Sequence, residues 1–380
     1  MERRVCRYTD TTLSCMTYRL KLLLFFSLLL QIPAYGQDSV RCGRWITVNA
    51  HYGYIVPLYS NAMDILIKAH VPAVEIDYMN KTTGELPWQH AFLCPETGVA
   101  FFCAWLGNPA QLGNMYGIYP YVNLHLQKSY REALYFRIGS GIGYFPVIFN
   151  RLTNHKDNVI GAHFDAMINL RLNAHFYLSQ NLRLEAGIGA THCSDGNYQT
   201  PNLGINLLTV NAGLSYCLGS YYHRPPCYKD SVRKQNKTEN NFYMGLGLSE
   251  MEPPGGKKYG AVTINYTHYY VINNRSKFGF GADVFDNYTN IARMAADSIY
   301  LKSPLENIQL GVKGSYELTL GKISLPIEIG AYVYTKYQGI EVYNRIGVRY
   351  YANKHLILTQ TLLLHIASAD YMEWGVGYRL

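Results

Sequence analysis

The sequence predicts an all-β protein, a transmembrane antiparallel β-barrel, and three observations support this prediction. Charged residues make up only 16% of the 380-residue chain, which contains 35 tyrosines and 33 glycines. Apolar and polar residues alternate in segments of about ten residues, as in strands that cross an outer membrane. Beyond the N-terminal region, no run of about 18 apolar residues indicates a membrane-spanning helix. Composition alone leaves one alternative, a soluble all-β protein.

The N-terminal region has the pattern of a secretory signal peptide. Arg19 and Lys21 precede an apolar core over 22–30, and Ala34-Tyr35-Gly36, with small residues at its first and last positions, offers a cleavage site before Gln37. Residues 1–15 fit poorly as the charged region of such a signal, so we expect Met16 to be the true start. We therefore predict a signal peptide over 1–36 and an exported mature chain.

Cysteine usage fits export but predicts no metal centre. Six of the eight cysteines follow the signal region. Disulfides are allowed in an oxidising compartment, but six cysteines permit 15 pairings and the sequence does not choose among them. No Cys-x-x-Cys and no His/Cys cluster at metal spacing occurs, so we expect neither a metal nor another cofactor.

The mature chain divides into two sets of eight strand-like segments. The first set forms an expected barrel over 37–219, with strands near 45–57, 72–80, 98–106, 115–127, 133–145, 159–178, 182–194 and 207–218. A polar, basic and proline-bearing stretch over 220–241 reads as a linker. The second set forms an expected barrel-like domain over 242–380, with strands near 242–251, 259–272, 277–288, 308–320, 323–336, 342–352, 356–368 and 371–380. The sequence leaves open whether these sets make two barrels or one sixteen-stranded barrel.

Three polar residues share an apolar face in the last two strands of the first set. Side chains alternate between the two faces of a strand. One face of the seventh strand therefore presents Leu182, Leu184, Ala186, Ile188, Ala190, His192 and Ser194. Asn206 has the parity of the apolar row that follows it, Leu208, Val210, Ala212, Leu214, Tyr216 and Leu218. Polar groups on a lipid-facing surface indicate chemistry at that surface. If the N-terminus is periplasmic, an even strand count puts the loop between these strands on the extracellular side.

The run THCSDGNYQTPNLGIN, residues 191–206, resembles the signature of the outer-membrane lipid A 3-O-deacylase family (PagL-like, acyloxyacyl hydrolase). That signature combines a His-x-Ser pair, an Asn-Gly-like turn and a Pro-Asn-x-Gly loop. The resemblance spans roughly 45–218. It implies an eight-stranded barrel in the outer membrane of a Gram-negative bacterium, carrying a serine esterase that removes an ester-linked acyl chain from lipid A of lipopolysaccharide. The partners implied are lipopolysaccharide and outer-membrane lipid, and we expect no nucleic acid because no basic stripe accompanies the aromatic residues.

The chemistry of ester cleavage assigns roles to these residues. An ester hydrolase needs a nucleophile, a base, a group that orients the base, and donors for the oxyanion. Ser194 is the candidate nucleophile and His192 the candidate general base. By the family resemblance, Asn202 and a backbone amide near Gly196 or Asn197 would form the oxyanion hole. Gly204 would allow a tight return into the last strand.

One position departs from the family pattern. Relatives with a full catalytic triad carry Glu where this chain has Asn206. Replacing the triad acid by its amide costs about 10⁴ in kcat in a Ser-His-Asp enzyme, because the histidine adopts the wrong tautomer. Three interpretations stay open: Asn206 orients His192 adequately, Asp195 or Glu185 supplies the acid, or the enzyme is slow or inactive. The alternative function is a non-catalytic outer-membrane barrel, structural or binding, that retains a degenerate motif.

Overall fold

The computed structural model describes residues 40–57, 61–126, 134–219, 221–223, 237–337, 341–366 and 368–380. The predicted signal peptide and residues 224–236 of the predicted linker lie outside the described residues. No helix in the described ranges is long and apolar enough to cross a bilayer.

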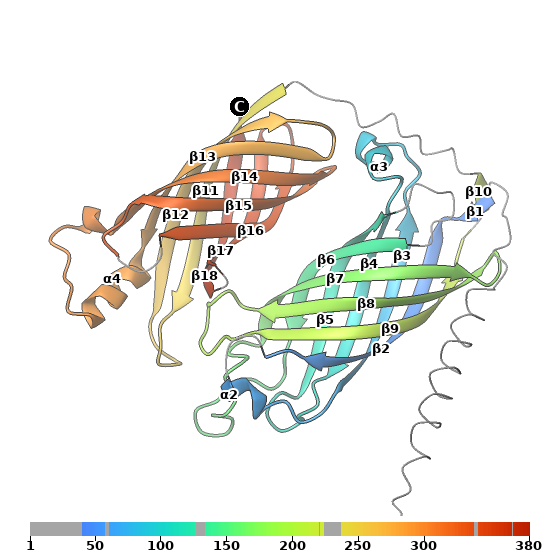
Figure 1. Ribbon diagram of the computed structural model, residues 1–380, viewed down its shortest axis with the longest axis horizontal. Helices are drawn as coiled ribbons and strands as arrows, with labels where there is room; N and C mark the ends of the chain where they lie inside the picture. Colours follow the sequence, from blue (N-terminus) through green and yellow to red (C-terminus); the bar gives the residue numbers. More distant parts are fainter. Residues whose placement is uncertain are drawn as a thin grey trace, which may run out of the picture. The chain divides into compact units, whose positions relative to one another are not determined.

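The predicted fold class is confirmed, because the chain forms two closed antiparallel barrels of eight strands each (Figure 1). The first barrel contains β2 (Arg44–Ile55), β3 (Val71–Lys81), β4 (Glu96–Trp105), β5 (Asn114–His125), β6 (Leu134–Tyr144), β7 (Phe164–Tyr177), β8 (Leu182–Ser194) and β9 (Ile205–Cys217). The second contains β11 (Lys237–Glu250), β12 (Lys258–Val271), β13 (Ser276–Asn287), β14 (Ile308–Leu320), β15 (Ile323–Tyr334), β16 (Val342–Tyr351), β17 (Leu356–His365) and β18 (Ser368–Arg379). Strand β9 pairs with β2 and strand β18 pairs with β11, so each barrel closes on itself.

Most observed strands begin and end close to the predicted bounds. A clear difference is β7, which begins at Phe164 and not at residue 159. The carboxylate of Asp157 accepts hydrogen bonds from the backbone amides of Val159 (3.0 Å) and Ile160 (3.2 Å). These bonds hold the segment as a loop, since side-chain acceptors compete with ladder pairing.

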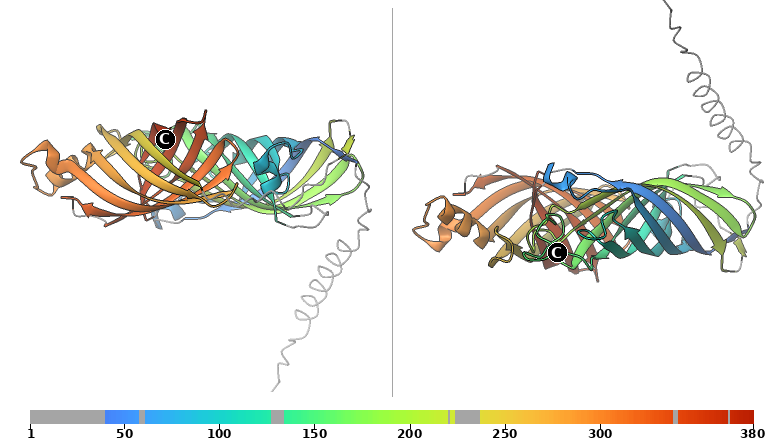
Figure 2. Two further views of the ribbon diagram at one scale, coloured as in Figure 1. Left: turned by 90° about the horizontal axis from the view of Figure 1, so that it is seen from above. Right: turned by 90° about the horizontal axis from the view of Figure 1, so that it is seen from below.

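Exposure alternates along the strands in the sense expected of a membrane barrel. On β2, Ile46, Val48, Tyr52 and Tyr54 are exposed, whereas the residues of opposite parity point into the barrel and are buried, namely Trp45, Thr47, Asn49, His51 and Gly53. The exposed rows of both barrels are mainly apolar. Figure 2 shows the strands of each barrel tilting across the front and back walls of a cylinder. The apolar exterior therefore surrounds each barrel, as a bilayer requires.

The lumen of each barrel is filled by charged side chains in ion pairs. In the first barrel, Arg171 donates to Glu75 (2.6 Å) and Arg137 donates to Asp77 (2.9 Å). In the second barrel, Arg345 pairs with Glu328 at 2.6 Å. All of these groups are buried. Buried charges persist in proteins when they are paired and hydrogen-bonded, so each lumen is a packed polar core.

A few short elements lie outside the barrel walls. They are β1 (Val40–Cys42), which pairs with β10 (Tyr221–His223), and α2 (Asn61–Asp64), α3 (Pro87–Ala91), α4 (Tyr288–Ala296) and η2 (Pro304–Asn307). Both β10 and the start of β11 fall in the range 220–241 that we expected to be a linker. Among the described cysteines, Cys94 and Cys217 each take part in a disulfide, and Cys103 and Cys193 are free thiols.

Candidate functional site

The candidate residues lie on the outer wall of the first barrel, at the end opposite the linker. Strands β8 and β9 are antiparallel neighbours, and His192 is directly opposite Asn206 in their register. The neighbours Thr191 and Cys193 are buried in the lumen, whereas His192 and Ser194 are partly exposed on the outside. His192 and Ser194 therefore face outward from β8, as the alternation of the sequence predicts.

The ring of His192 is oriented by the side chain of Asn206. The ring Nδ1 lies 2.8 Å from Asn206 Oδ1, and an amide oxygen can only accept, so Nδ1 carries the proton and donates it. This tautomer leaves Nε2 with a free lone pair, which is the form a general base needs. The Asn206 Nδ2 group is buried and has no hydrogen-bond partner among the described residues.

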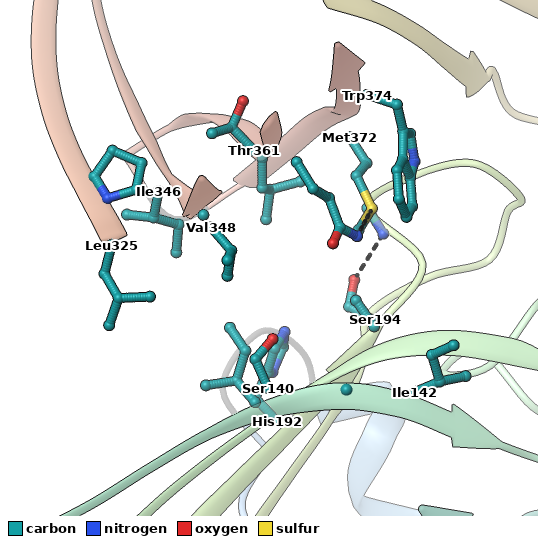
Figure 3. A pocket seen from close by; sticks show the side chains of 18 of the residues that line it. Ser140, Ile142, His192, Ser194, Leu325, Ile346, Val348, Thr361, Met372 and Trp374 are labelled. Carbon is teal, nitrogen blue, oxygen red and sulfur yellow. Dashed lines mark hydrogen bonds between the residues drawn. The ribbon is translucent and has the colours of Figure 1, made fainter. Parts of the chain in front are cut away.

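Donors for an oxyanion converge on the hydroxyl of Ser194. Asn202 Nδ2 donates to Ser194 Oγ at 2.9 Å, and the backbone N–H of Gly196 donates to the same oxygen at 3.2 Å. Figure 3 shows Ser194 with a hydrogen bond to its hydroxyl and with His192 on the same wall. A side-chain amide and a backbone N–H around one oxygen are the donor types that form oxyanion holes.

Within the described residues, the His192 ring and the Ser194 hydroxyl share no hydrogen bond. Residues two apart on a strand are about 6.6–6.8 Å apart along it, so contact requires both side chains to lean together. The Ser194 hydroxyl oxygen instead accepts hydrogen bonds from Asn202 Nδ2 and from the backbone N–H of Gly196. Catalytic hydrogen bonds are often long in ligand-free sites and tighten when substrate binds. Rotation about χ1 of Ser194 would move Oγ away from Asn202 Nδ2 and the Gly196 N–H and leave these two donors free.

Asp195 organises the loop that carries Asn202. Its carboxylate accepts from the backbone amides of Tyr198 (3.1 Å) and Gln199 (2.9 Å). Burial raises the pKa of Asp195 to about 6, against the opposing effect of these backbone hydrogen bonds. The structure thus directs this carboxylate to the loop backbone and does not bring it to His192. The sequence analysis did not predict that Asp195 organises this loop, although an Asp followed closely by Gly and Asn is a turn signal.

Two glycines shape the backbone around the catalytic candidates. Gly196 and Gly204 have φ of +69° and +70°, a conformation that side chains disfavour. A Cβ on Gly204 would lie 2.8 Å from the carbonyl oxygen of Cys193 and 3.1 Å from His192 Cε1. Gly204 therefore lets the loop return close beside the histidine. Asn197, proposed with Gly196 as an amide donor, also has a positive φ, of 70°.

The alternative acid Glu185 and a histidine of the second barrel, His365, lie away from this set. Glu185 is buried in the lumen, where it accepts from Arg183 (3.1 Å) and Ser215 (2.7 Å). In the second barrel, His365 is hydrogen-bonded to the hydroxyl of Tyr332 at 2.9 Å. In the part of the chain that the structure describes, no group of three or more His, Cys, Asp or Glu side chains could hold a metal ion.

Ser194 and His192 open into an apolar groove of about 1460 Å³. One wall comes from the first barrel and includes Ser140 and Ile142, and the facing wall includes Leu325, Ile346 and Trp374 (Figure 3). Hydrocarbon side chains dominate both walls. The sequence did not indicate the second wall, because the pairing of two distant surfaces leaves no local pattern.

Comparison with known protein families gives two matches. Residues 74–215 match the model of the family described as lipid A 3-O-deacylase (PagL). Residues 238–380 match the model described as acyloxyacyl hydrolase, C-terminal domain. No curated protein sequence matches the chain.

Comparison with solved structures includes two matches of low identity. Neisserial surface protein A is 10% identical to this chain. The match covers 46% of this chain and 97% of that protein, with a TM-score of 0.31. The outer membrane protein Omp33 of Acinetobacter baumannii is 12% identical, covers 90% of this chain and 99% of its own, and has a TM-score of 0.17.

Proposed function

The chain belongs to the lipid A 3-O-deacylase (PagL) and acyloxyacyl hydrolase family, and from this premise we propose that it is a serine esterase that cleaves an acyl ester of lipid A. The family indicates an outer-membrane lipid A deacylase. It also implies lipid A of lipopolysaccharide as the substrate. We propose further that Ser194 is the nucleophile, His192 the general base, and Asn202 with the Gly196 amide the oxyanion hole.

The single observation that carries this proposal is the outward-facing set around Ser194. His192 is held by Asn206 in the tautomer of a base, and two hydrogen-bond donors already converge on the Ser194 hydroxyl. All of these groups lie on the wall that meets lipid acyl chains. Lumen residues such as Glu185 could not reach an acyl ester in the bilayer.

The proposed reaction has two steps. Ser194 Oγ attacks the ester carbonyl carbon while His192 Nε2 takes the hydroxyl proton, and the oxyanion accepts from Asn202 Nδ2 and Gly196 N. The carbon–oxygen bond to lipid A then breaks, and His192 returns the proton to the departing alkoxide. In the second step, water attacks the acyl-serine while His192 Nε2 takes a proton from that water, and the bond from the acyl carbon to Ser194 Oγ then breaks. His192 returns the proton to Ser194 Oγ, and the fatty acid leaves.

Mass spectrometry of lipid A tests this proposal. Cells expressing the wild type should contain lipid A that lacks one ester-linked acyl chain. Cells expressing Ser194→Ala should contain intact lipid A, because the variant has no nucleophile. Ser179→Ala is a matched control, since Ser179 is exposed in the turn between β7 and β8 at the opposite end of the barrel.

The competing function is a non-catalytic barrel, and the amide at position 206 is the observation that favours it. It predicts identical lipid A from cells with the wild type, Ser194→Ala and Ser179→Ala. Such a result would refute the esterase.

A further inference from the structure

We propose that the second barrel forms the facing wall of the acyl-binding groove and that Leu362 and Met372 on this wall select the length of the acyl chain. This inference rests on the proposed function of Ser194 and His192. It assigns a role to the second barrel, which has no counterpart of the His192–Ser194 set among its described residues.

Residues 39–380 form one compact unit, and the groove runs between the outer walls of its two barrels. Ser194, His192 and Ile168 line it from the first barrel. Leu362 on β17 and Met372 on β18 line it from the second. The substrate group that suits such a lining is a hydrocarbon chain, because burial of apolar surface favours binding without any polar partner.

The second wall lies next to the proposed oxyanion hole. A Cβ placed on Gly196 would be 3.1 Å from Leu362 Cδ1 and 3.1 Å from Met372 Cβ. The backbone N–H of Gly196 donates to Ser194 Oγ. Leu362 and Met372 therefore lie at the start of the groove beside the reacting ester, and a long acyl chain has to pass them to enter it.

Polar contacts hold the catalytic loop against the second barrel. The backbone N–H of Glu250 donates to the carbonyl oxygen of Asn197 at 3.0 Å, and Asn197 Nδ2 donates to the carbonyl oxygen of Asp370 at 3.4 Å. The Lys258 ammonium lies 3.3 Å from the centroid of the Tyr198 ring. Contacts from three segments fix the spacing of the two walls, and a fixed spacing is what lets a groove discriminate between chains.

The strand count makes this arrangement compatible with a membrane. The β8–β9 loop lies at the end of the first barrel opposite the linker, and Glu250 ends β11, the first strand after the linker. With eight strands in the first barrel, both positions fall on the same side of the bilayer. The groove volume of about 1460 Å³ exceeds the roughly 300–1,000 Å³ typical of small-molecule pockets. A substrate with long acyl chains needs that room.

The test compares ester hydrolysis by detergent-folded full-length protein on p-nitrophenyl butyrate and p-nitrophenyl palmitate. Leu362→Trp narrows the groove beyond the ester, so we expect kcat/KM on palmitate to fall at least about tenfold relative to that on butyrate. Leu362→Ala widens the groove and should shift the ratio towards palmitate or leave it unchanged. Val312→Trp is the matched control, because Val312 is half-exposed on the outer wall of β14 and does not line the groove.

Each outcome decides one claim. Hydrolysis of both esters by Ser194→Ala at the wild-type rate would refute the proposed function itself. If Ser194→Ala is inactive but Leu362→Trp leaves the palmitate-to-butyrate ratio unchanged, the esterase stands and the role of the second barrel is refuted. Heat-dependent gel migration verifies that each variant barrel is folded.

Discussion

At the scale of single residues, the contact between His192 and Asn206 decides how well the site can act. The amide oxygen accepts the Nδ1 proton at 2.8 Å and so selects the tautomer of a base. A neutral amide cannot stabilise the imidazolium that forms when His192 takes the serine proton, whereas a carboxylate does so by charge. Asn206 therefore provides the orientation that a triad acid would provide, without the electrostatic contribution.

Replacing this amide by a carboxylate should accelerate the reaction. We expect Asn206→Glu to raise kcat on a short-chain ester by at least about tenfold, as the charged partner stabilises the imidazolium. Asn206→Leu, which removes the acceptor, should lower kcat. Steady-state kinetics at pH 8 measures both. A rate unchanged by Asn206→Glu and Asn206→Leu alike would show that position 206 does not act on His192.

Asp195 should make stability depend on pH. Burial raises its pKa from 3.8 to about 6, so the folded protein binds this proton more tightly than the unfolded chain does. The stabilisation from this group is therefore complete below pH 4 and is lost as the pH rises towards 6. The loss amounts to at most about 3 kcal/mol.

Urea unfolding at pH 4.5 and pH 7.5 measures this effect. Asp195→Asn should show a smaller fall in unfolding free energy between these pH values than the wild type, since an amide does not titrate. Asp157, whose pKa burial also raises to about 6, is unchanged in both proteins and cancels in the comparison. An equal fall in both proteins would contradict the prediction.

At the scale of elements, the β8–β9 hairpin brings the site together. The antiparallel register places His192 opposite Asn206, and the loop between the strands returns Asn202 to Ser194. This return depends on Gly204, which has a positive φ and no room for a side chain beside His192. The conformation of this loop thus determines where Asn202 lies relative to Ser194 and His192.

Gly204→Ala should damage both stability and catalysis. An alanine there is strained by about 1–2 kcal/mol through its backbone conformation, and its Cβ would press on Cys193 O and His192 Cε1. We expect a fall in kcat of at least about tenfold together with a lower unfolding midpoint. Gly314→Ala is the control, because a Cβ at Gly314 on β14 meets nothing within 4 Å. Similar losses in both variants would show that the effect is general to strand glycines.

At the scale of the whole molecule, the outer wall and the lumen have separate tasks. The outer wall carries Ser194 and His192, and the lumen carries networks such as Glu75 with Arg137 and Arg171. Removing one member of a buried ion pair is strongly destabilising, because the remaining charge stays buried without its partner. The lumen should therefore govern stability while leaving the chemistry on the exterior intact.

Glu75→Gln tests this separation. We expect the variant to lose about 3–5 kcal/mol of unfolding free energy and to retain the wild-type kcat below its unfolding transition. Glu85→Gln is the control, because Glu85 is exposed and should change stability by less than about 0.5 kcal/mol. A large fall in kcat of folded Glu75→Gln would show that the lumen network also positions the site.

The sequence by itself determined the strands and the face on which each side chain lies. Alternation of apolar and polar residues is a local property, since successive side chains of a strand point to opposite faces whatever the strand pairs with. This is why the outward parity of His192, Ser194 and Asn206, and the inward position of Glu185, were predictable. The motif that resembles the family signature is also local, and the family match confirmed that resemblance.

Only the tertiary structure decided what depends on partners distant in sequence. The two barrels close because β9 pairs with β2 and β18 pairs with β11. These pairs are joined by backbone hydrogen bonds, which any residue type can form, so the sequence does not reveal them. The same holds for Arg183 and Glu96, which meet across the lumen at 3.1 Å. The use of Asp195 within its own loop and the apolar wall facing Ser194 likewise arise from distances and contacts, which the chain acquires only when it folds.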